Sequence, residues 1–414
     1  MPVDKTTLLA WIERDRDLIV GFLQAFLQAP SPNPPGDTRA AAAVVSRFLD
    51  AHALPWRTVA PVAEWPNLIG TFDTGRAGRH LVLNGHMDVF PVDETEQWTH
   101  GPWSGALAHG RIWGRGAVDM KAGTAASIFT YRYLHEARDA LAGKLTLTCV
   151  SDEETFGPYG ARWLVEHEPE VLGDCVLNGE PSSPGTIRFG EKAPLWLRFD
   201  LRTPGAHGAY THHTASATKT MARLIVDLEE IVGDEVIPPG RIGEALAAAG
   251  EAIDRAMGPG AAAILQRYTL NVGTIQGGLK VNLIPGHCAF EADFRLPVGG
   301  RKDELMTRIA GVLQRYPGVT VEELNFTEPA ACDPFHPMVA HLRSNARMVG
   351  DVDPLPAISL GGTDARLWRQ RGIPAYVYGP SPEGMGRKDE AVPVEEYLHV
   401  VKVHVLSAFD YLRR

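Results

Sequence analysis

The stretch LVLNGHMDV, residues 81–89, is a short apolar run that ends in polar side chains, a pattern typical of a buried β-strand followed by a loop. LTLTCVSDEE (145–154) and CVLNGEP (175–181) have the same form. Between the first two runs, residues 119–138 show a helical pattern that opens at Asp119 and carries Ala and Ile on one side. The order strand, helix, strand predicts an α/β fold with a mostly parallel sheet flanked by helices.

A different pattern begins near residue 192. LWLRFDLR (195–202) alternates strictly between apolar and polar side chains, which indicates an antiparallel sheet with one face in water. Further helical and strand patterns complete the order β-α-β-β-α-β of an α+β ferredoxin-like sandwich. These patterns cover about 214–232, 269–278, 281–295, 302–315 and 319–326.

After about residue 330 the chain returns to α/β character, with IPAYVYGP (373–380) as a buried strand. We therefore expect a discontinuous larger domain over residues 1–191 and 330–414, with a second domain over 192–329 inserted into it. An Ala/Gly-rich insertion, about 238–264, could cap a site, extend an interface or fill space.

Composition limits the possible partners. The 414 residues carry 40 Lys and Arg against 50 Asp and Glu, a formal net charge of −10, which argues against nucleic acid as the main partner. Apolar runs are far shorter than the roughly 20 residues of a membrane-spanning helix, and the N-terminal MPVDKTTLLAWIERDRD breaks the apolar core that a signal peptide needs. We expect a cytoplasmic protein with neither a membrane nor a nucleic-acid partner.

Acidic and histidine side chains follow the predicted strands of the larger domain. They are His86 and Asp88, Asp119, Glu153 and Glu154, and Glu180. Because the carboxyl ends of parallel strands meet at one edge of a sheet, these side chains can converge. Bunched carboxylates raise one another's pKa unless a cation neutralises them. Imidazole and carboxylates together suit zinc, manganese or cobalt, so we expect a divalent metal site in the larger domain.

Four segments, in chain order, resemble the motifs of one family of metallohydrolases. They are GHMD (85–88), GRGAVDMKAG (114–123), SDEE (151–154) and NGEP (178–181). The family includes aminoacylase, acetylornithine deacetylase, succinyl-diaminopimelate desuccinylase and glutamate carboxypeptidase. The resemblance covers nearly the whole chain. It implies a metallopeptidase-like catalytic domain and gives the inserted domain, 192–329, the role of a lid or dimerisation domain.

The resemblance also implies a role for each matching metal ligand. His86 and Glu180 would bind one metal ion, Asp119 would bridge two ions, and Glu154 would bind the second. Asp88 would hold the His86 ring through its other nitrogen, as is usual for metal-bound histidine.

The same comparison implies that Glu153 is the general base, which takes a proton from water and returns it to the leaving nitrogen. Asp152 is the nearby alternative base. A cis peptide bond is expected between Asp119 and Met120.

Other matching residues would meet the substrate. His207 would reach into the site of a partner subunit and stabilise the developing oxyanion, which requires at least a homodimer. Asn282 and Arg295 match lid residues, and Arg295 could bind a substrate carboxylate in a bidentate manner. Gly361 and Gly362 lie in SLGGTDAR, which resembles the family's glycine turn. Structural alternatives are an exposed loop histidine for His207 and a salt bridge on the strand face for Arg295.

One position departs from the family pattern. The family usually has a metal-binding histidine three residues before a final acidic pair, and Gly386 stands there in GPSPEGMGRKDEAV (379–392). The loss affects the site that Glu154 serves. We expect that His86, Asp119 and Glu180 bind one ion and that Glu154 is left as a weak ligand or acts through other groups. Alternatively the loop works differently, or another side chain fills in; the candidates are Glu383, Asp389 and Glu390.

We therefore expect a metal-dependent hydrolase that cleaves a C–N bond in a small carboxylate-bearing substrate, such as the amide of an N-acyl amino acid or a small peptide-like molecule. The protein would form a homodimer or a higher homo-oligomer. One alternative is metal-dependent deamination of an aromatic amine such as nitroanthranilate, because a single ion suits an electrophilic substrate. Another is a relative that binds a ligand without catalysis. The exact substrate and the native metal stay open.

Overall fold

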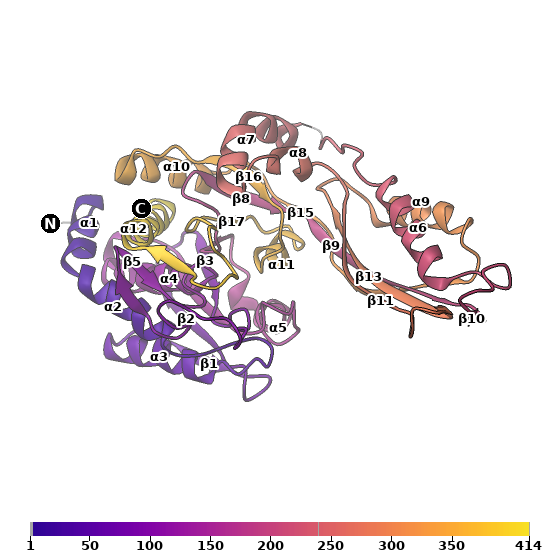
Figure 1. Ribbon diagram of the computed structural model, residues 1–414. Coiled ribbons are helices and arrows are strands. Elements are labelled where there is room, and N and C mark those ends of the chain that lie inside the picture. The colour runs from indigo at the N-terminus through magenta and orange to yellow at the C-terminus, as the bar shows by residue number, and fades with distance from the viewer. Residues whose placement is uncertain (1–2, 239, 414) are drawn as a thin grey trace.

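The larger part of the protein is built on a nine-stranded sheet (Figure 1). The computed structural model describes residues 3–238 and 240–413, so residues 1, 2 and 414 of the predicted larger domain lie outside it. The strand order is β1-β2-β6-β3-β7-β17-β8-β15, and β16 also pairs with β8. The strands are β1 (Arg57–Val59), β2 (Asn67–Asp73), β3 (His80–His86), β6 (Lys144–Val150), β7 (Cys175–Asn178), β8 (Thr186–Glu191), β15 (Ala330–Ala331), β16 (Leu355–Ser359) and β17 (Ala375–Val377).

The centre of this sheet is parallel, as the sequence predicts. β3 pairs in parallel with both β6 and β7, and β17 pairs in parallel with β7. Antiparallel pairing appears toward the edges, where β1 joins β2, β2 joins β6 and β15 joins β8. The sheet is therefore mixed as a whole, with its parallel part where the predicted polar clusters follow the strands.

Helices cover both faces of the sheet, and each face has its own apolar core. Along β3, Leu81 and Leu83 face the larger core while Val82 faces the smaller one, the alternation expected of a strand buried on both sides. The larger core includes α1 (Lys5–Arg14), α2 (Arg16–Leu27), α3 (Arg39–Ala51), α4 (Lys121–Glu136), α10 (Pro337–Gly350) and α12 (Val394–Leu412). The smaller core includes α5 (Ala161–His167) and α11 (Ala365–Arg369).

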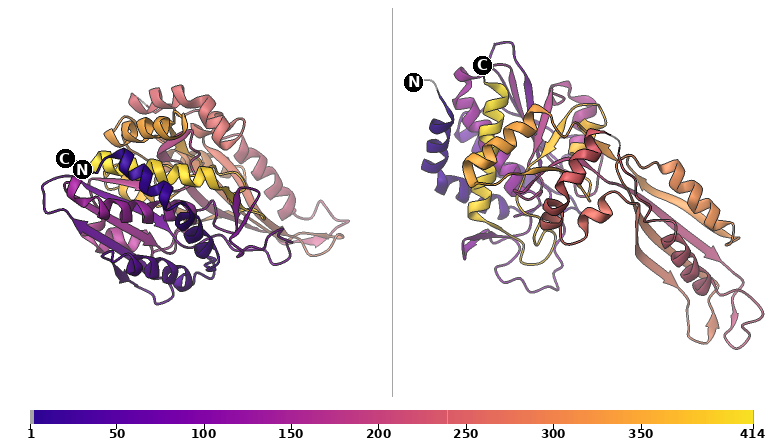
Figure 2. Two further views of the ribbon diagram at one scale, coloured as in Figure 1. Left: turned by 90° about the vertical axis from the view of Figure 1, so that its left-hand side faces the viewer. Right: turned by 90° about the horizontal axis from the view of Figure 1, so that it is seen from above.

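The second part is a four-stranded antiparallel sheet with the order β11-β13-β9-β14, and it extends away from the first (Figure 2). Its apolar core combines the buried face of β9, residues Leu195, Leu197, Phe199 and Leu201, with the helices. The chain order β9-α6-β11-β13-α9-β14 confirms the predicted ferredoxin-like arrangement. The elements are β9 (Ala193–Arg202), α6 (Ala217–Glu229), β11 (Thr269–Gly277), β13 (His287–Leu296), α9 (Lys302–Leu313) and β14 (Val319–Phe326). A short pair at the tip consists of β10 (Ala206–His207) and β12 (Leu283–Ile284).

Two helices in the middle of the inserted range belong to the larger core. α7 (Arg241–Met257) and α8 (Ala261–Leu265) account for most of the Ala/Gly-rich insertion predicted at about 238–264. Residue 239 of that range lies outside the described residues. The buried side of α7, Ala245, Leu246, Ala249 and Ile253, joins the core of the nine-stranded sheet, and α7 packs against β16. The predicted boundaries at 192–329 stay a prediction, and the buried residues of α7 and α8 belong to the core of the larger body.

A small third sheet lies beside the first. Its strands are β4 (Ala106–Ala108), β5 (Arg111–Trp113) and β18 (Ala391–Pro393). The pairing of β18 with β5 brings the segment before residue 391 next to the loop that precedes α4. Within residues 3–238 and 240–413, no helix has the length and apolar character to cross a membrane. Single turns of 3-10 helix lie at Arg138–Ala140 and Pro169–Val171.

Candidate metal centre

Three neighbouring parallel strands deliver the predicted site. His86 is the last residue of β3, Glu153 follows β6 by three residues, and Glu180 follows β7 by two. Because β3 lies between β6 and β7, these residues emerge side by side at the carboxyl edge of the sheet. Asp119 comes from the loop before α4, and the expected cis peptide joins it to Met120.

His86, Asp119 and Glu180 form a compact buried group. One ligand atom from each lies within 4.8 Å of the other two. Nε2 of His86 is 3.3 Å from Oδ1 of Asp119 and 3.3 Å from Oε1 of Glu180. This nitrogen is buried and has no hydrogen-bond partner. Two oxygens and one nitrogen therefore face a common point without a neighbouring donor, as the ligands of a divalent cation do.

The other ring nitrogen fixes the orientation of His86. Nδ1 lies 2.9 Å from the main-chain carbonyl oxygen of Asp88 and 3.5 Å from its side-chain Oδ1. Donation to the carbonyl leaves the Nε2 lone pair directed at the two carboxylates. Asp88 Oδ2 instead accepts hydrogen bonds from Nδ2 of Asn33 (2.9 Å) and from the backbone N–H of Glu154 (3.0 Å). Asp88 thus contacts the second ring nitrogen of His86, more closely through its main-chain carbonyl than through its carboxylate.

The electrostatics of the group favour a bound cation. Burial, followed by the charge of Asp119, raises the pKa of Glu180 to about 8. Burial alone would lower the pKa of His86, but the carboxylates of Glu180, Asp119 and Asp88 outweigh it and raise that pKa well above 6.5. Negative charges crowded in a buried site need a positive charge among them, and the group fits a divalent metal ion.

Two further glutamates flank the group. Oε2 of Glu153 lies 4.0 Å from Nε2 of His86, and its Oε1 lies 3.6 Å from Nη1 of Arg366. Burial raises the pKa of Glu153 well above its usual value. Burial, and then the charge of Asp119, does the same for Glu154, whose Oε1 has no hydrogen-bond partner. Within the described residues, neither glutamate is part of the three-residue group.

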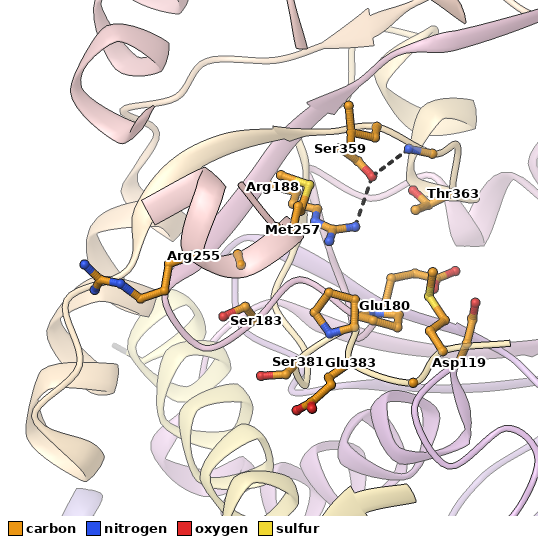
Figure 3. A pocket seen from close by; sticks show the side chains of 18 of the residues that line it. Asp119, Glu180, Ser183, Arg188, Arg255, Met257, Ser359, Thr363, Ser381 and Glu383 are labelled. Atoms are coloured by element: carbon orange, nitrogen blue, oxygen red, sulfur yellow. Dashed lines mark hydrogen bonds between the residues drawn. The ribbon is translucent and has the colours of Figure 1, made fainter. Parts of the chain in front are cut away.

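A cavity of about 640 Å³ opens beside the metal ligands (Figure 3). Asp119 and Glu180 line it, and the predicted Gly361 and Gly362 form part of its wall. A side chain on Gly361 would meet open space, whereas a Cβ on Gly362 would lie 3.1 Å from the ring of Phe156. The last residues of α7, including Met257, line the cavity as well.

The model of peptidase family M20/M25/M40 matches residues 82–409. The chain belongs to this family. The predicted family is thus confirmed, and with it the expectation of a metal-dependent hydrolase that acts on C–N bonds.

Individual relatives agree with this membership. A succinyl-diaminopimelate desuccinylase from Cereibacter sphaeroides is 27% identical over 359 residues, covering 84% of this chain and 87% of that protein. Another from Methylorubrum extorquens is 37% identical over 158 residues, which span 36% of this chain and 41% of the relative.

Solved structures show the same fold. The structure of an M20 family metallo-carboxypeptidase from Sulfolobus solfataricus superimposes with a TM-score of 0.78 at 19% identity, covering 95% of this chain and 99% of that one. Human carnosine dipeptidase 1 superimposes with a TM-score of 0.74 at 14% identity, covering 99% of each chain. These likenesses confirm the predicted combination of an α/β catalytic domain with an inserted α+β domain.

In this M20 chain both carboxylate oxygens of Asp152, the alternative base, accept hydrogen bonds from neighbouring residues. Asp152 has a left-handed backbone (φ 66°), and its Oδ1 accepts a 2.7 Å hydrogen bond from Oγ1 of Thr155. Its Oδ2 accepts a 3.1 Å hydrogen bond from the backbone N–H of Tyr159. Asp152 therefore closes the turn after β6, which leaves Glu153 as the carboxylate that faces His86.

The segment of the missing histidine supplies no side chain to the three-residue group in the described parts of the chain. Gly386 is exposed with φ 71°. Glu383 is exposed and lies 4.0 Å from Arg111, and Asp389 binds Thr99. Glu390 is buried, but it pairs with Arg115 through a 2.7 Å contact. None of the three acids joins His86, Asp119 and Glu180 in the described residues, although Glu383 lines the same cavity.

The predicted substrate residues of the inserted domain lie away from the metal ligands. His207 and Asn282 are exposed neighbours at the tip, where the backbone N–H of Gly208 donates to the Asn282 carbonyl (2.7 Å). Arg295 pairs with Asp293 on the same strand at 2.9 Å, as its structural alternative predicted. None of the three lines the cavity beside Asp119.

The sequence analysis missed several residues of this region. Asn33 holds Asp88 from a distant part of the chain, and no local pattern marks it. Glu390 was a candidate ligand from the sequence, but its hydrogen bond from the backbone of Asp119 was not predicted. Arg366 is the last residue of SLGGTDAR (359–366), the segment that resembles the family's glycine turn. That resemblance was the available signal for its position beside Glu153. Arg188 lies in the middle of the buried strand β8, where a charged residue among apolar neighbours was the available signal.

Proposed function

We propose that this protein hydrolyses an amide C–N bond in a small, carboxylate-bearing molecule such as an N-acyl amino acid. The observation that carries the proposal is the difference in position between Asp119 and Glu180, which converge with His86, and Glu153, which lies beside them. Two carboxylates and an unpartnered imidazole nitrogen converge on one point, while Glu153 lies beside them and is not among them. A carboxylate that is close to the ligands but not one of them is suited to proton transfer.

His86, Asp119 and Glu180 would hold one divalent ion, which could be zinc, manganese or cobalt. When bound, such an ion lowers the pKa of water toward neutrality and polarises a carbonyl oxygen. We propose one ion per chain, because Gly386 has no side chain to complete a second set of ligands with Glu154. Glu154 would then act as a weak ligand or through its hydrogen bond to Asp88.

Glu153 would move the proton. Its Oε2 faces His86 and would accept a proton from water as the water oxygen adds to the acyl carbon. Glu153 would then give that proton to the nitrogen as the C–N bond breaks, so that a carboxylic acid and an amine leave. Nη1 of Arg366 lies 3.6 Å from the opposite oxygen, Oε1, and its charge would favour the orientation in which Oε2 faces the reacting atoms.

The tip of the inserted domain would complete the site of a second subunit. His207 is exposed, and Figure 1 shows its strand β10 at the end of the inserted domain far from β3. Contact with the site of its own chain would require a large movement, whereas a partner subunit could receive it directly. We therefore propose a homodimer or a higher homo-oligomer in which His207 stabilises the oxyanion in trans and Asn282 and Arg295 approach the substrate.

A metal add-back experiment tests this function. The purified protein is stripped with a chelator, reloaded with zinc, manganese or cobalt, and supplied with a panel of N-acyl amino acids, small peptides and 2-aminobenzoates. Metal-dependent release of an amine from an N-acyl amino acid or a peptide is the expected result. Ammonia release from an aminobenzoate would instead support the deaminase. Inactivity of the fully metal-loaded protein on the whole panel would favour a ligand-binding relative.

A further inference from the structure

A buried arginine faces the same cavity as the metal ligands. Arg188 lies on β8 with 8% of its surface exposed, and it lines the cavity together with Asp119 and Glu180. Its Nη1 donates a 3.0 Å hydrogen bond to Oγ of Ser359. Its Nε has no hydrogen-bond partner, and Arg188 makes no ion pair with any carboxylate in the described chain. In Figure 3 its side chain lies above Glu180, between β16 and the metal ligands.

The guanidinium of Arg188 stays charged without a counter-ion in contact. Burial lowers its pKa to about 10, and the more distant carboxylates of Glu180 and Asp119 oppose that change, so the group is cationic at neutral pH. A buried charge is costly unless a partner pairs with it. Asp119 and Glu180 cannot serve as that partner once they hold a metal ion, because the ion takes up their charge. The loaded site therefore leaves a positive charge and unused N–H donors facing the cavity.

The surroundings of Arg188 fix its position and leave room for a ligand. Ser359 holds one end of the guanidinium, and the glycine turn that follows begins at Gly361, where a Cβ would meet nothing within 4 Å. Met257, at the end of α7, lies next to Arg188 in Figure 3 and adds an apolar wall. The end of α7 thus forms part of the wall of the cavity that Arg188 faces.

We propose that Arg188 is a specificity-determining residue that binds the carboxylate of the substrate. The planar guanidinium matches a carboxylate with parallel hydrogen bonds, and the lining of a metal site by acids otherwise disfavours an anionic substrate. The inference rests on the proposed function, because it names the substrate group that reaches the same cavity. It differs from the part given to Arg295, which lies outside the cavity and is already paired with Asp293.

A pair of substrates that differ in one group tests the inference. The best N-acyl amino acid from the panel is compared with its carboxamide, in which the free carboxylate is replaced by a neutral amide. Wild-type protein should prefer the carboxylate by about 100-fold in kcat/KM, as the loss of a charge-assisted hydrogen-bonded pair predicts. Arg188→Met should lose about 100-fold on the carboxylate and change less than about threefold on the carboxamide, with its metal content unchanged.

Arg255→Met is the matched control. Arg255 lines the outer part of the same cavity, but it is exposed, and in Figure 3 it points away from the metal ligands. The same substitution there should keep the preference for the carboxylate. Arg188→Lys retains the charge without the planar fork and should lose about tenfold on the carboxylate only. It also provides the test if Arg188→Met does not fold.

The possible outcomes separate the inference from the function on which it rests. An active wild-type enzyme with no preference for the carboxylate would overturn the role of Arg188 and leave the hydrolase in place. So would a full preference retained in both Arg188 variants. A wild-type protein that is inactive on every N-acyl amino acid and peptide would overturn the proposed function, and the role of Arg188 with it.

Discussion

The side chain of Glu390 accepts a hydrogen bond of 3.2 Å from the backbone N–H of Asp119, 271 residues earlier in the chain. The same oxygen accepts a 2.8 Å hydrogen bond from the backbone N–H of Val118. Its other oxygen lies 2.7 Å from Nη1 of Arg115, and Arg115 and Glu390 are only 3% and 1% exposed. Glu390, four residues after Gly386, therefore fixes the turn that presents Asp119, one of the proposed metal ligands.

Substitution of Glu390 should weaken metal binding and folding together. Glu390→Gln keeps a carbonyl acceptor but leaves the buried Arg115 unpaired, which should reduce the free energy of unfolding by about 3 kcal/mol. Loss of the support for Asp119 should weaken metal binding by about 10-fold to 100-fold. Urea unfolding and metal titration measure the two effects. Asp389→Asn, which alters a more exposed acid bonded to Thr99, is the control and should change the unfolding free energy by less than about 1 kcal/mol.

Glu153→Gln should separate metal binding from catalysis. The amide cannot accept the proton, so kcat should fall by about 1,000-fold, while the three ligands and hence the metal content stay unchanged. Steady-state kinetics and metal analysis on one preparation give both values. Asp152→Asn should unfold more easily because the side chain closes the turn at Thr155 and Tyr159. If Asp152→Asn were inactive and Glu153→Gln active, the two acids would exchange roles.

Metal analysis should find about one ion per wild-type chain. The three-residue group accounts for one set of ligands, and Gly386 has no side chain to complete another. His86→Ala removes the nitrogen ligand, and after dialysis it should retain less than about a tenth of an ion. Two tightly held ions per wild-type chain would mean that other residues bind a second ion together with Glu154, and the single-ion proposal would be wrong.

Acid should destabilise the fold through His404, which is remote from the metal ligands in the chain. Nε2 of His404 lies 2.6 Å from the carbonyl oxygen of Tyr378, while its buried Nδ1 has no partner. Burial lowers the pKa of His404 to about 4, against about 6.5 in the unfolded chain. Below pH 6.5 the unfolded state binds the additional proton, so stability that is complete above pH 6.5 is lost as the pH falls toward 4. The loss should be about 2 kcal/mol at pH 5.

Urea unfolding at pH 7 and pH 5 checks this expectation. His404→Gln retains an N–H donor for Tyr378 but cannot titrate, so its stability should depend less on pH than that of the wild type, by about 2 kcal/mol between the two values. His212→Gln, an exposed histidine at the tip, is the control and should follow the wild type. Equal pH dependence in the wild type and His404→Gln would show that another group governs acid unfolding.

The sequence predicted what depends on local periodicity. The alternation from Leu195 to Leu201 identified β9, and the polar residues after three apolar runs converge because parallel strands share an edge. What it could not predict depends on contacts between remote segments. The apolar face of α7 shows that the helix packs somewhere, but not that it packs on β16. The pairing of Glu390 with Arg115 and the direction of Arg188 into the cavity are likewise set by the tertiary structure.

Because α7 and α8 return to the larger body, the chain crosses between the two bodies four times, where a simple insertion would need two crossings. The inner pair of crossings is joined by a 3.1 Å hydrogen bond from Gly233 to Tyr268, and Nζ of Lys192, at the first crossing, binds the carbonyls of Ile264 and Arg267. The smaller body is therefore joined to the larger one by four chain segments that are hydrogen-bonded to one another. One of these segments leads into α7, whose last residues line the cavity, so a change in the angle between the two bodies would displace part of the cavity wall.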